Sequence, residues 1–162
     1  MEDVWLNDVW ALYFHDPYDN NWDRESYIKL FTFSNINEFW MMYTVINNIL
    51  NEGMFFIMRD YIFPKWNELE NKDGGFLSIK ILKEKVPSFC EDILINLINE
   101  TILLSDFYDK SDLINGISIS PKKHFCIIKI WLRNCELSDI SKFNIKNEYY
   151  GDILFKPNTC MM

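Results

Sequence analysis

The feature that most constrains the fold of this chain is the spacing of its apolar residues, which switches between a period of two and a period of 3.6. The first period is typical of β-strands with one buried face, and the second is typical of amphipathic helices. Period-two segments predict strands over residues 9–14, 27–33, 54–62, 76–82, 116–120, 125–132 and 152–156. Helical spacing covers 34–50, 88–104 and the short amphipathic stretch 136–151. Strands interleaved with irregularly spaced helices predict an α+β fold, in which helices cover one face of an antiparallel sheet.

The starts of the two longer helices are marked by specific residues. Asn35 can cap the helix predicted over 34–50, and Glu38 stands three residues later, as in a capping box. The helix predicted over 88–104 begins just after Pro87, and proline is well tolerated in the first turn of a helix.

Length and charge bound the class of protein. A chain of 162 residues has the size of one domain, so we expect residues 1–162 to form a single domain. The formal net charge of -8 argues against a protein that coats duplex DNA or RNA, because such binding relies on many lysine and arginine contacts to phosphates. No DNA partner is therefore expected, and an RNA partner must be held at a local site.

Sequence features also bear on location and on metals. The acidic N-terminus predicts no signal peptide, and no run of 18 apolar residues predicts a membrane span, so we expect a cytoplasmic protein without a membrane partner. Four cysteines without a C-x-x-C pair and two distant histidines predict reduced, mostly buried thiols and no metal site. Richness in Asn, Ile, Lys, Phe and Tyr is typical of A/T-biased genomes such as those of viruses or parasites. For a viral protein the location is the host cytoplasm.

The sequence carries no common catalytic motif. A G-x-S-x-G elbow, a P-loop and an H-E-x-x-H helix are all missing. Carboxylate pairs such as Glu91 and Asp92 have the pattern of a solvated helix face. We therefore expect no enzyme, no catalytic residues and no cofactor.

Two tryptophans stand in polar loops. Trp22 lies in "PYDNNWDRES" and Trp66 in "FPKWNELENKDGG", whereas Trp10, Trp40 and Trp131 fall within strand or helix patterns and are explained by packing. A single loop tryptophan can fold back over the edge of the core. Two in separate loops favour an aromatic clamp for a flat ligand.

At these residues the sequence resembles the translation initiation factor 4E family, whose members bind the 7-methylguanosine cap of messenger RNA. The resemblance runs from residue 5 to residue 157. It is carried by "WALYF" followed by Trp22, by "NEFWMMY", by "RDYIFPKWNELENKDGGF" and by "IWLRNCE".

The resemblance implies a curved antiparallel sheet of about eight strands, with three helices on the convex face and a cap slot on the concave face. It also implies that Trp22 and Trp66 stack on the base, because N7 methylation gives guanine a positive charge that attracts indole faces. Trp131 matches the tryptophan that touches the N7 methyl group.

The guanine edge departs from the family pattern. Family members place a glutamate directly after the second stacking tryptophan, and this chain has Asn67 there. An amide has one acceptor oxygen, so it replaces a bidentate, charge-assisted contact poorly. We expect Glu68, or Asn67 with water, to recognise the guanine edge.

The resemblance places the cations for the cap triphosphate in the hairpin "PKKH". The family's arginine and lysine align with Lys122 and His124, Lys123 is adjacent, and a further family lysine is replaced by Ile127. Histidine adds charge only when protonated, so phosphate-dependent affinity is expected to rise below about pH 6.5. The alternative is a basic turn that serves only solubility.

Trp40 matches the family tryptophan that receives scaffold factor 4G and competing repressors through a short helical motif. Ile36 and Asn99 align with neighbouring contact positions. The family's His-Pro pair is replaced by Val4 and Trp5, and a helix leucine is replaced by Glu91. The usual partner motif should therefore bind less well, and an altered, matched scaffold is expected.

Three functions follow from the resemblance. The first is a cap-binding protein that recruits capped messenger RNA to the initiation machinery through a 4G-like scaffold. The second is a cap-binding repressor or decoy that does not recruit the scaffold. The third is an interaction module that keeps the partner surface but has lost cap binding, which the replacement of a family arginine by Phe76 makes conceivable.

Overall fold

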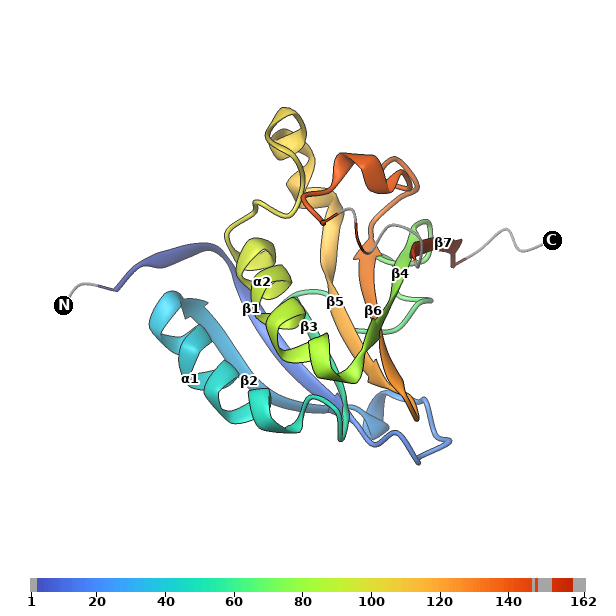
Figure 1. The fold of residues 1–162 in the computed structure, drawn as a ribbon. Helices are drawn as coiled ribbons and strands as arrows, with labels where there is room; N and C mark the ends of the chain where they lie inside the picture. The colour runs from blue at the N-terminus through green and yellow to red at the C-terminus, as the bar shows by residue number, and fades with distance from the viewer. Residues whose placement is uncertain (1–2, 147, 149–152, 159–162) are drawn as a thin grey trace.

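The computed structural model describes residues 3–146, 148 and 153–158. Seven strands in this part of the chain form one antiparallel sheet in the order β2-β1-β3-β5-β6-β4-β7 (Figure 1). Their bounds are β1 (Trp5–His15), β2 (Ile28–Asn35), β3 (Met54–Arg59), β4 (Gly75–Leu82), β5 (Ile114–Pro121), β6 (Phe125–Leu132) and β7 (Ile153–Pro157). The α+β class is confirmed. The strand count is seven, not the eight that the resemblance implied, and each of the seven corresponds to a period-two segment.

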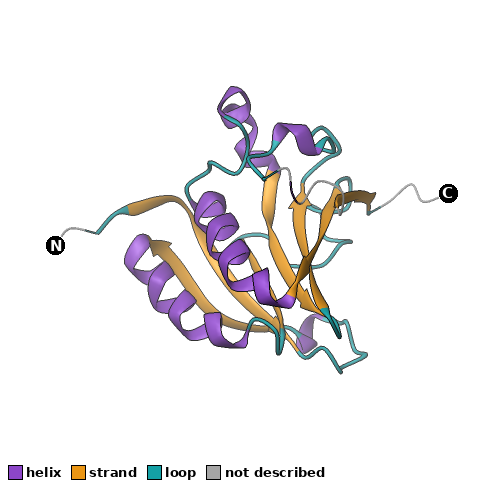
Figure 2. Ribbon diagram, in the orientation of Figure 1, coloured by secondary structure: helices purple, strands orange, loops and turns teal. Residues whose placement is uncertain are grey.

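Two α-helices lie across one face of the curved sheet, α1 (Ile36–Ile46) and α2 (Val86–Ile98) (Figure 2). The predicted Asn35 cap is present, and Glu38 bonds to the residue before the cap instead of to the Asn35 N–H of a strict capping box. The Asn35 side chain accepts a hydrogen bond from the Glu38 backbone N–H at 2.8 Å, and the Glu38 carboxylate accepts one from the Ser34 N–H at 3.0 Å. Pro87 lies in the first turn of α2.

Short 3-10 helices complete the fold. They are η1 (Arg24–Ser26), η2 (Asn47–Ile49), η3 (Lys83–Lys85), η4 (Ser105–Leu113) and η5 (Ile140–Lys142). The helix predicted over 34–50 is divided between α1 and η2, because its last turn tightens to 3-10 geometry. The nine residues of η4 form the third longer helical segment. Of the helix predicted over 136–151, the described helical residues are those of η5 and Glu148, both in 3-10 geometry.

The second α-helix ends earlier than predicted because its C-terminus forms a Schellman motif. The Glu100 N–H bonds to the Leu97 carbonyl at 3.2 Å, and the Thr101 N–H bonds to the Asn96 carbonyl at 2.9 Å. Glu100 has a φ of 60°, a left-handed conformation that usually falls to glycine. The side chain of Glu100, described below, explains why glutamate stands there.

Apolar residues fill both faces of the sheet. The larger cluster lies between the sheet and the helices and includes Phe39, Ile57, Ile93 and Ile130. Alternation along the strands sends the neighbouring residues to the opposite face. There a second cluster forms, consisting of Ala11, Tyr13, Phe56, Met58, Ile62 and Trp131.

The cysteines largely follow expectation. Cys90 and Cys126 are buried thiols, whereas Cys135 is exposed. Burial raises the pKa of the Cys126 thiol, so it stays protonated. Cys160 lies outside the described residues.

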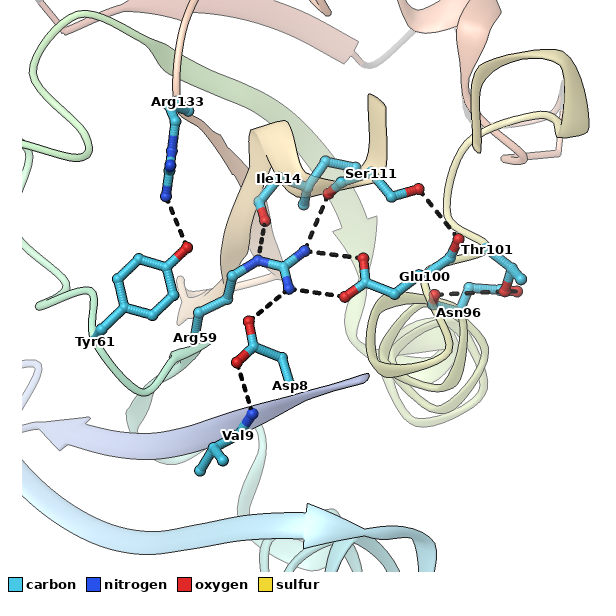
Figure 3. A network of polar contacts seen from close by, with 10 residues as sticks. All are labelled: Asp8, Val9, Arg59, Tyr61, Asn96, Glu100, Thr101, Ser111, Ile114 and Arg133. Atoms are coloured by element: carbon cyan, nitrogen blue, oxygen red, sulfur yellow. Dashed lines mark hydrogen bonds and ion pairs between the residues drawn. The ribbon is translucent and has the colours of Figure 1, made fainter. Parts of the chain in front are cut away.

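A buried guanidinium joins the sheet to the end of α2 (Figure 3). Arg59, at the end of β3, is 4% exposed. Its Nη atoms donate to both carboxylate oxygens of Glu100 at 2.7 and 2.9 Å, and Nη1 also donates to Asp8 at 2.9 Å. Nε and Nη2 donate to the backbone carbonyls of Ile114 and Ser111 at 2.9 and 3.0 Å. The bidentate pair offsets the unfavourable backbone conformation of Glu100.

We expect Arg59→Ala to lower the free energy of unfolding by about 3 to 5 kcal/mol, because it removes a buried cation and leaves the partly buried carboxylates of Asp8 and Glu100 without this donor. Urea denaturation measures this. Lys29→Ala is the matched control, because Lys29 pairs with Asp60 at a similar 2.7 Å but both side chains are well exposed. That change should cost less than about 1 kcal/mol. Equal losses of unfolding free energy in the two variants would show that the Arg59 contacts stabilise the fold no more than an exposed ion pair does.

Candidate functional site

A cavity of about 340 Å³ opens on the face of the sheet opposite the α-helices. Its base is formed by β3, β5, β4 and β6, and its rim by the loops that follow β1 and β3 and by the end of β7. The lining residues are Trp22, Tyr27, Met54, Phe56, Pro64, Lys65, Trp66, Phe76, Ser118, Ser120, Lys129, Trp131, Pro157 and Asn158. We call this cavity the slot. It brings together three of the tryptophans that the sequence singled out.

Trp22 lies in the loop between β1 and β2, and its side chain is 43% exposed. The loop is shaped by consecutive Asx turns, in which Asp16, Asp19 and Asn21 each accept a hydrogen bond from the backbone N–H two residues later, all at 2.9 Å. The indole stacks on the ring of His15, with centroids 3.8 Å apart and planes inclined by 2°. One face of Trp22 is therefore covered, and the other face is free for the slot.

Trp66 lies in the loop between β3 and β4 and is 54% exposed. This loop is built around Asn71, which is fully buried. The Asn71 amide donates to the carbonyls of Phe63 and Lys65 at 3.0 and 2.8 Å, and its oxygen accepts from Asn115 at 2.8 Å. These bonds fix the chain on the N-terminal side of Trp66 to the sheet.

The glycine pair after this loop allows close backbone contact. A Cβ added to Gly74 would lie 1.8 Å from the Leu132 carbonyl oxygen, and one added to Gly75 would lie 2.3 Å from the Lys156 carbonyl oxygen. Only glycine lets the loop return between β6 and β7 at this distance. The Gly-Gly pair thus positions the second wall of the slot.

The two tryptophan loops are linked by an ion pair. The Arg24 guanidinium donates to Glu68 Oε1 at 2.7 Å and lies 4.1 Å above the ring centroid of Phe63. Asn67 is exposed beside Trp66. Neither residue expected at the guanine edge is part of the slot lining: Glu68 is paired with Arg24, and Asn67 is exposed next to Trp66.

The floor of the slot is aromatic. Trp131 is 7% exposed, and its indole N–H donates to the Ser118 hydroxyl at 3.0 Å. Phe56 lies edge to face with the Trp131 ring, with ring centroids 6.3 Å apart. Burial raises the pKa of Tyr27 to about 12, so this lining hydroxyl stays neutral.

Lys129 lines the slot and was not anticipated from the sequence. Its Nζ lies 4.3 Å from the ring centroid of Phe76. Burial, and then the charges of Lys122 and Lys156, lower the pKa of Lys129. The period-two pattern of 125–132 contains the signal that was missed, because Lys129 has the same strand parity as Trp131.

The predicted phosphate residues lie at the tip of the hairpin between β5 and β6. Lys122, Lys123 and His124 are exposed there, next to the slot lining rather than within it. Lys122 is close enough to act on the pKa of Lys129, and Lys156 approaches from β7, where it pairs with Phe76. Lys122, Lys129 and Lys156 form no ion pair in the described chain, so they create a local positive potential in an acidic protein.

A second surface lies on the helix side. Trp40 on α1 is 39% exposed and packs edge to face on Phe39 at 5.1 Å. Ile36 donates its N–H to the Val4 carbonyl at 3.0 Å, which places the exposed N-terminal residues beside the start of α1. Trp5 is 68% exposed in this region.

Asn99 and Glu91 complete the positions that the resemblance assigned to the partner surface. Both are exposed on or next to α2. Glu91 is near enough to Tyr43 to raise the pKa of its hydroxyl, after the larger effect of burial. The Tyr43 ring in turn lies edge to face with the indole of Trp40, with ring centroids 6.1 Å apart. Tyr43 therefore lies between Glu91 and Trp40.

Comparison with known proteins decides the family. A sequence model described as "Eukaryotic initiation factor 4E" matches residues 5–161. The chain belongs to this family. It is 30% identical over 141 residues to translation initiation factor 4E-5 of Caenorhabditis elegans, spanning 80% of this chain and 66% of that relative. This chain therefore spans about two thirds of the length of a curated factor 4E.

Solved factor 4E structures share the fold. The chain superposes on Ascaris suum eIF4E-3, solved with an m7G cap, with a TM-score of 0.79 at 17% identity, covering 99% of this chain and 94% of that one. It superposes on a schistosome eIF4E, solved with m7GpppG and 4E-BP, with a TM-score of 0.78 at 21% identity, covering 97% and 90%. In the described residues, no helix is long and apolar enough to cross a membrane, and no cluster of three metal-ligating side chains occurs.

Proposed function

We propose that this factor 4E family member binds the 7-methylguanosine cap of messenger RNA in the slot, with the methylated guanine between Trp22 and Trp66. The observation that carries the proposal is the pairing of two half-exposed indoles from separate loops over one cavity with an aromatic floor. The cap-bound structures of similar fold support it.

The chemistry of the slot suits a flat cation. Each aromatic contact to a base contributes about 1 to 3 kcal/mol, and the positive charge of 7-methylguanine adds cation-π attraction. Trp131 on the floor offers an apolar surface to the N7 methyl group. Unmethylated guanine lacks the charge and the methyl group, so it binds more weakly.

The guanine edge is recognised by Asn67 and Glu68. Glu68 carries the carboxylate that the N1 and N2 hydrogens require, and its ion pair with Arg24 holds it at the junction of the two loops. Asn67 contributes one acceptor oxygen beside Trp66.

The triphosphate is held by Lys122, Lys123 and His124 at the hairpin tip, together with Lys129 inside the slot and Lys156 on β7. The two added lysines support this assignment because Lys129 lines the slot and lies close to the charges of Lys122 and Lys156. They supply charge where the family lysine aligned with Ile127 is missing.

The helix side receives a protein partner. Trp40, Ile36 and Asn99 offer an apolar and polar contact surface for a short helical motif of a 4G-like scaffold, which recruits the capped messenger RNA to the initiation machinery in the cytoplasm. The schistosome relative solved with 4E-BP supports a partner of this kind. A cap-binding repressor or decoy is the second candidate, because exposed Trp5 and Glu91 change this surface.

The cap proposal is tested with immobilised 7-methyl-GTP. We expect retention of the protein, elution by 7-methyl-GTP and poor elution by GTP. Trp22→Ala and Trp66→Ala should each weaken affinity by about 10- to 100-fold, because each removes one stacking face. Trp5→Ala is the matched control, since it removes an exposed tryptophan outside the slot. Unchanged retention of both loop variants would remove the stacking assignment, and no retention of the parent would favour the interaction module.

The phosphate assignment predicts a pH dependence. The pKa of Lys129 is lowered in the free protein, and a bound phosphate raises it, so binding takes up a proton. Affinity for 7-methyl-GTP is then greatest below the free-state pKa of Lys129 and falls as the pH rises through it. Lys129→Met should lose this alkaline fall and weaken binding by about 10-fold or more at neutral pH.

Isothermal titration with 7-methyl-GTP and with 7-methylguanosine separates the phosphate effect from stacking. Lys129→Met should affect only the triphosphate ligand. The control is Lys110→Met, which removes an exposed lysine paired with Glu136 outside the slot. An equal loss for both ligands would assign Lys129 to the base instead of the phosphates.

The partner surface separates the two candidate functions. Proteins that co-purify with the cap-bound parent, but not with Trp40→Ala, identify the partner of this surface, and mass spectrometry names them. A recruiting factor should bring initiation components through Trp40. A repressor or decoy should bring none of them and should inhibit capped reporter translation equally with and without Trp40.

A further inference from the structure

His15 occupies an unusual position at the edge of the slot. It is the last residue of β1, it pairs with Met54 of β3, and it is 0% exposed. Its ring lies parallel to the indole of Trp22, with centroids 3.8 Å apart. Tyr27 closes the group by meeting the His15 ring edge to face at 5.0 Å. A strand residue thus forms a rigid backing for a tryptophan that belongs to a loop.

The same imidazole also contacts the loop backbone at two points. Nδ1 lies 2.8 Å from the carbonyl oxygen of Asp16, and Nε2 lies 2.7 Å from the carbonyl oxygen of Asn21. Carbonyl oxygens only accept, so the neutral ring donates to one of them and the protonated ring donates to both. Asp16 begins the loop and Asn21 directly precedes Trp22. The ring therefore contacts the loop backbone at its first residue and directly before Trp22.

Trp22 has few other restraints. It is nearly half exposed, and the Asx turns of its loop organise the backbone without touching the indole. Within the described residues, its other aromatic contact is with the edge of Tyr27, with ring centroids 6.1 Å apart. Without the His15 ring, the indole would lose its stacked contact and gain rotational freedom, and stacking on a ligand would first require it to be ordered.

We propose that His15 is the positioning residue of Trp22. It covers the rear face of the indole and leaves the front face directed into the slot, so that the first wall of the slot is formed before the ligand arrives. This inference rests on the proposed stacking function of Trp22. It adds a residue that raises ligand affinity without contacting the ligand, because His15 stacks on Trp22 and is not part of the slot lining.

A purely structural His15 makes a different prediction from a positioning one. If His15 only fills the core, its replacement lowers stability and leaves the affinity of the folded protein unchanged. If it positions Trp22, its replacement lowers affinity, and the loss depends on the presence of Trp22. A double-mutant cycle measures that dependence directly.

The experiment uses the full chain and isothermal titration with 7-methyl-GTP, with the folded state of each variant checked by circular dichroism. His15→Val suits a strand and removes the ring, and it should weaken affinity by about 2- to 10-fold, the range expected for one aromatic pair. His15→Phe restores a stacking ring and should recover at least half of the lost binding free energy. In a Trp22→Ala background, His15→Val should cause no further loss. His15→Gln replaces His15→Val if that variant is not folded.

Three outcomes would overturn the inference: parent-like affinity of folded His15→Val, failure of His15→Phe to recover affinity, or the same loss in the Trp22→Ala background. These outcomes differ from failure of the proposed function. That failure appears as parent-like affinity of Trp22→Ala itself, whereas a strong effect of Trp22→Ala with silent His15 variants rejects only the positioning role.

Discussion

The guanidinium of Arg59 is the interaction on which the arrangement of sheet and helices depends. It lies at the end of β3 and binds Asp8 before the buried half of β1, the carbonyl of Ile114 at the start of β5, and Glu100 directly after α2. One buried cation therefore fixes three neighbouring strands and the end of a helix. Because β3 and β5 carry Phe56 and Ser118 on their other face, the same restraint holds the base of the slot in place. A ligand site on loops needs such a rigid base, since loop positions are only as accurate as the elements that carry them.

Each wall of the slot is also held by a buried polar side chain. A fully buried polar side chain binds loop carbonyls next to an exposed tryptophan: His15 contacts those of Asp16 and Asn21, and Asn71 contacts those of Phe63 and Lys65. The ion pair between Arg24 and Glu68 then joins the two loops across the slot. Polar groups organise the backbone, and the apolar indoles are left exposed. This explains how a chain can keep large aromatic side chains in solvent without their collapse onto the core.

The charge of the chain is unevenly distributed. The net charge of -8 argues against broad binding to nucleic acid, yet Lys122 and Lys156 lie near Lys129, which lines the slot. Only a ligand that combines a flat base with a nearby anionic group uses both features. The proposed partner surface around Trp40 is on the helix side of the sheet, so the proposed protein and nucleotide sites lie on opposite faces.

The sequence by itself determined the seven strands, the capped start of α1 at Asn35 and the two loop tryptophans, because these follow from local periodicity, capping chemistry and turn residues. Only the tertiary structure decided the early end of α2, since the left-handed Glu100 is held there by Arg59, which lies 41 residues away in sequence. It also decided that Lys129 joins the slot and that His15 stands behind Trp22. The alternation of residues along β6 could have predicted that Lys129 faces the slot, because it lies two residues from Trp131. No such pattern predicts the position of His15. Stacking and backbone contacts across a loop depend on how the chain returns in space, and no spacing of residue types encodes that path.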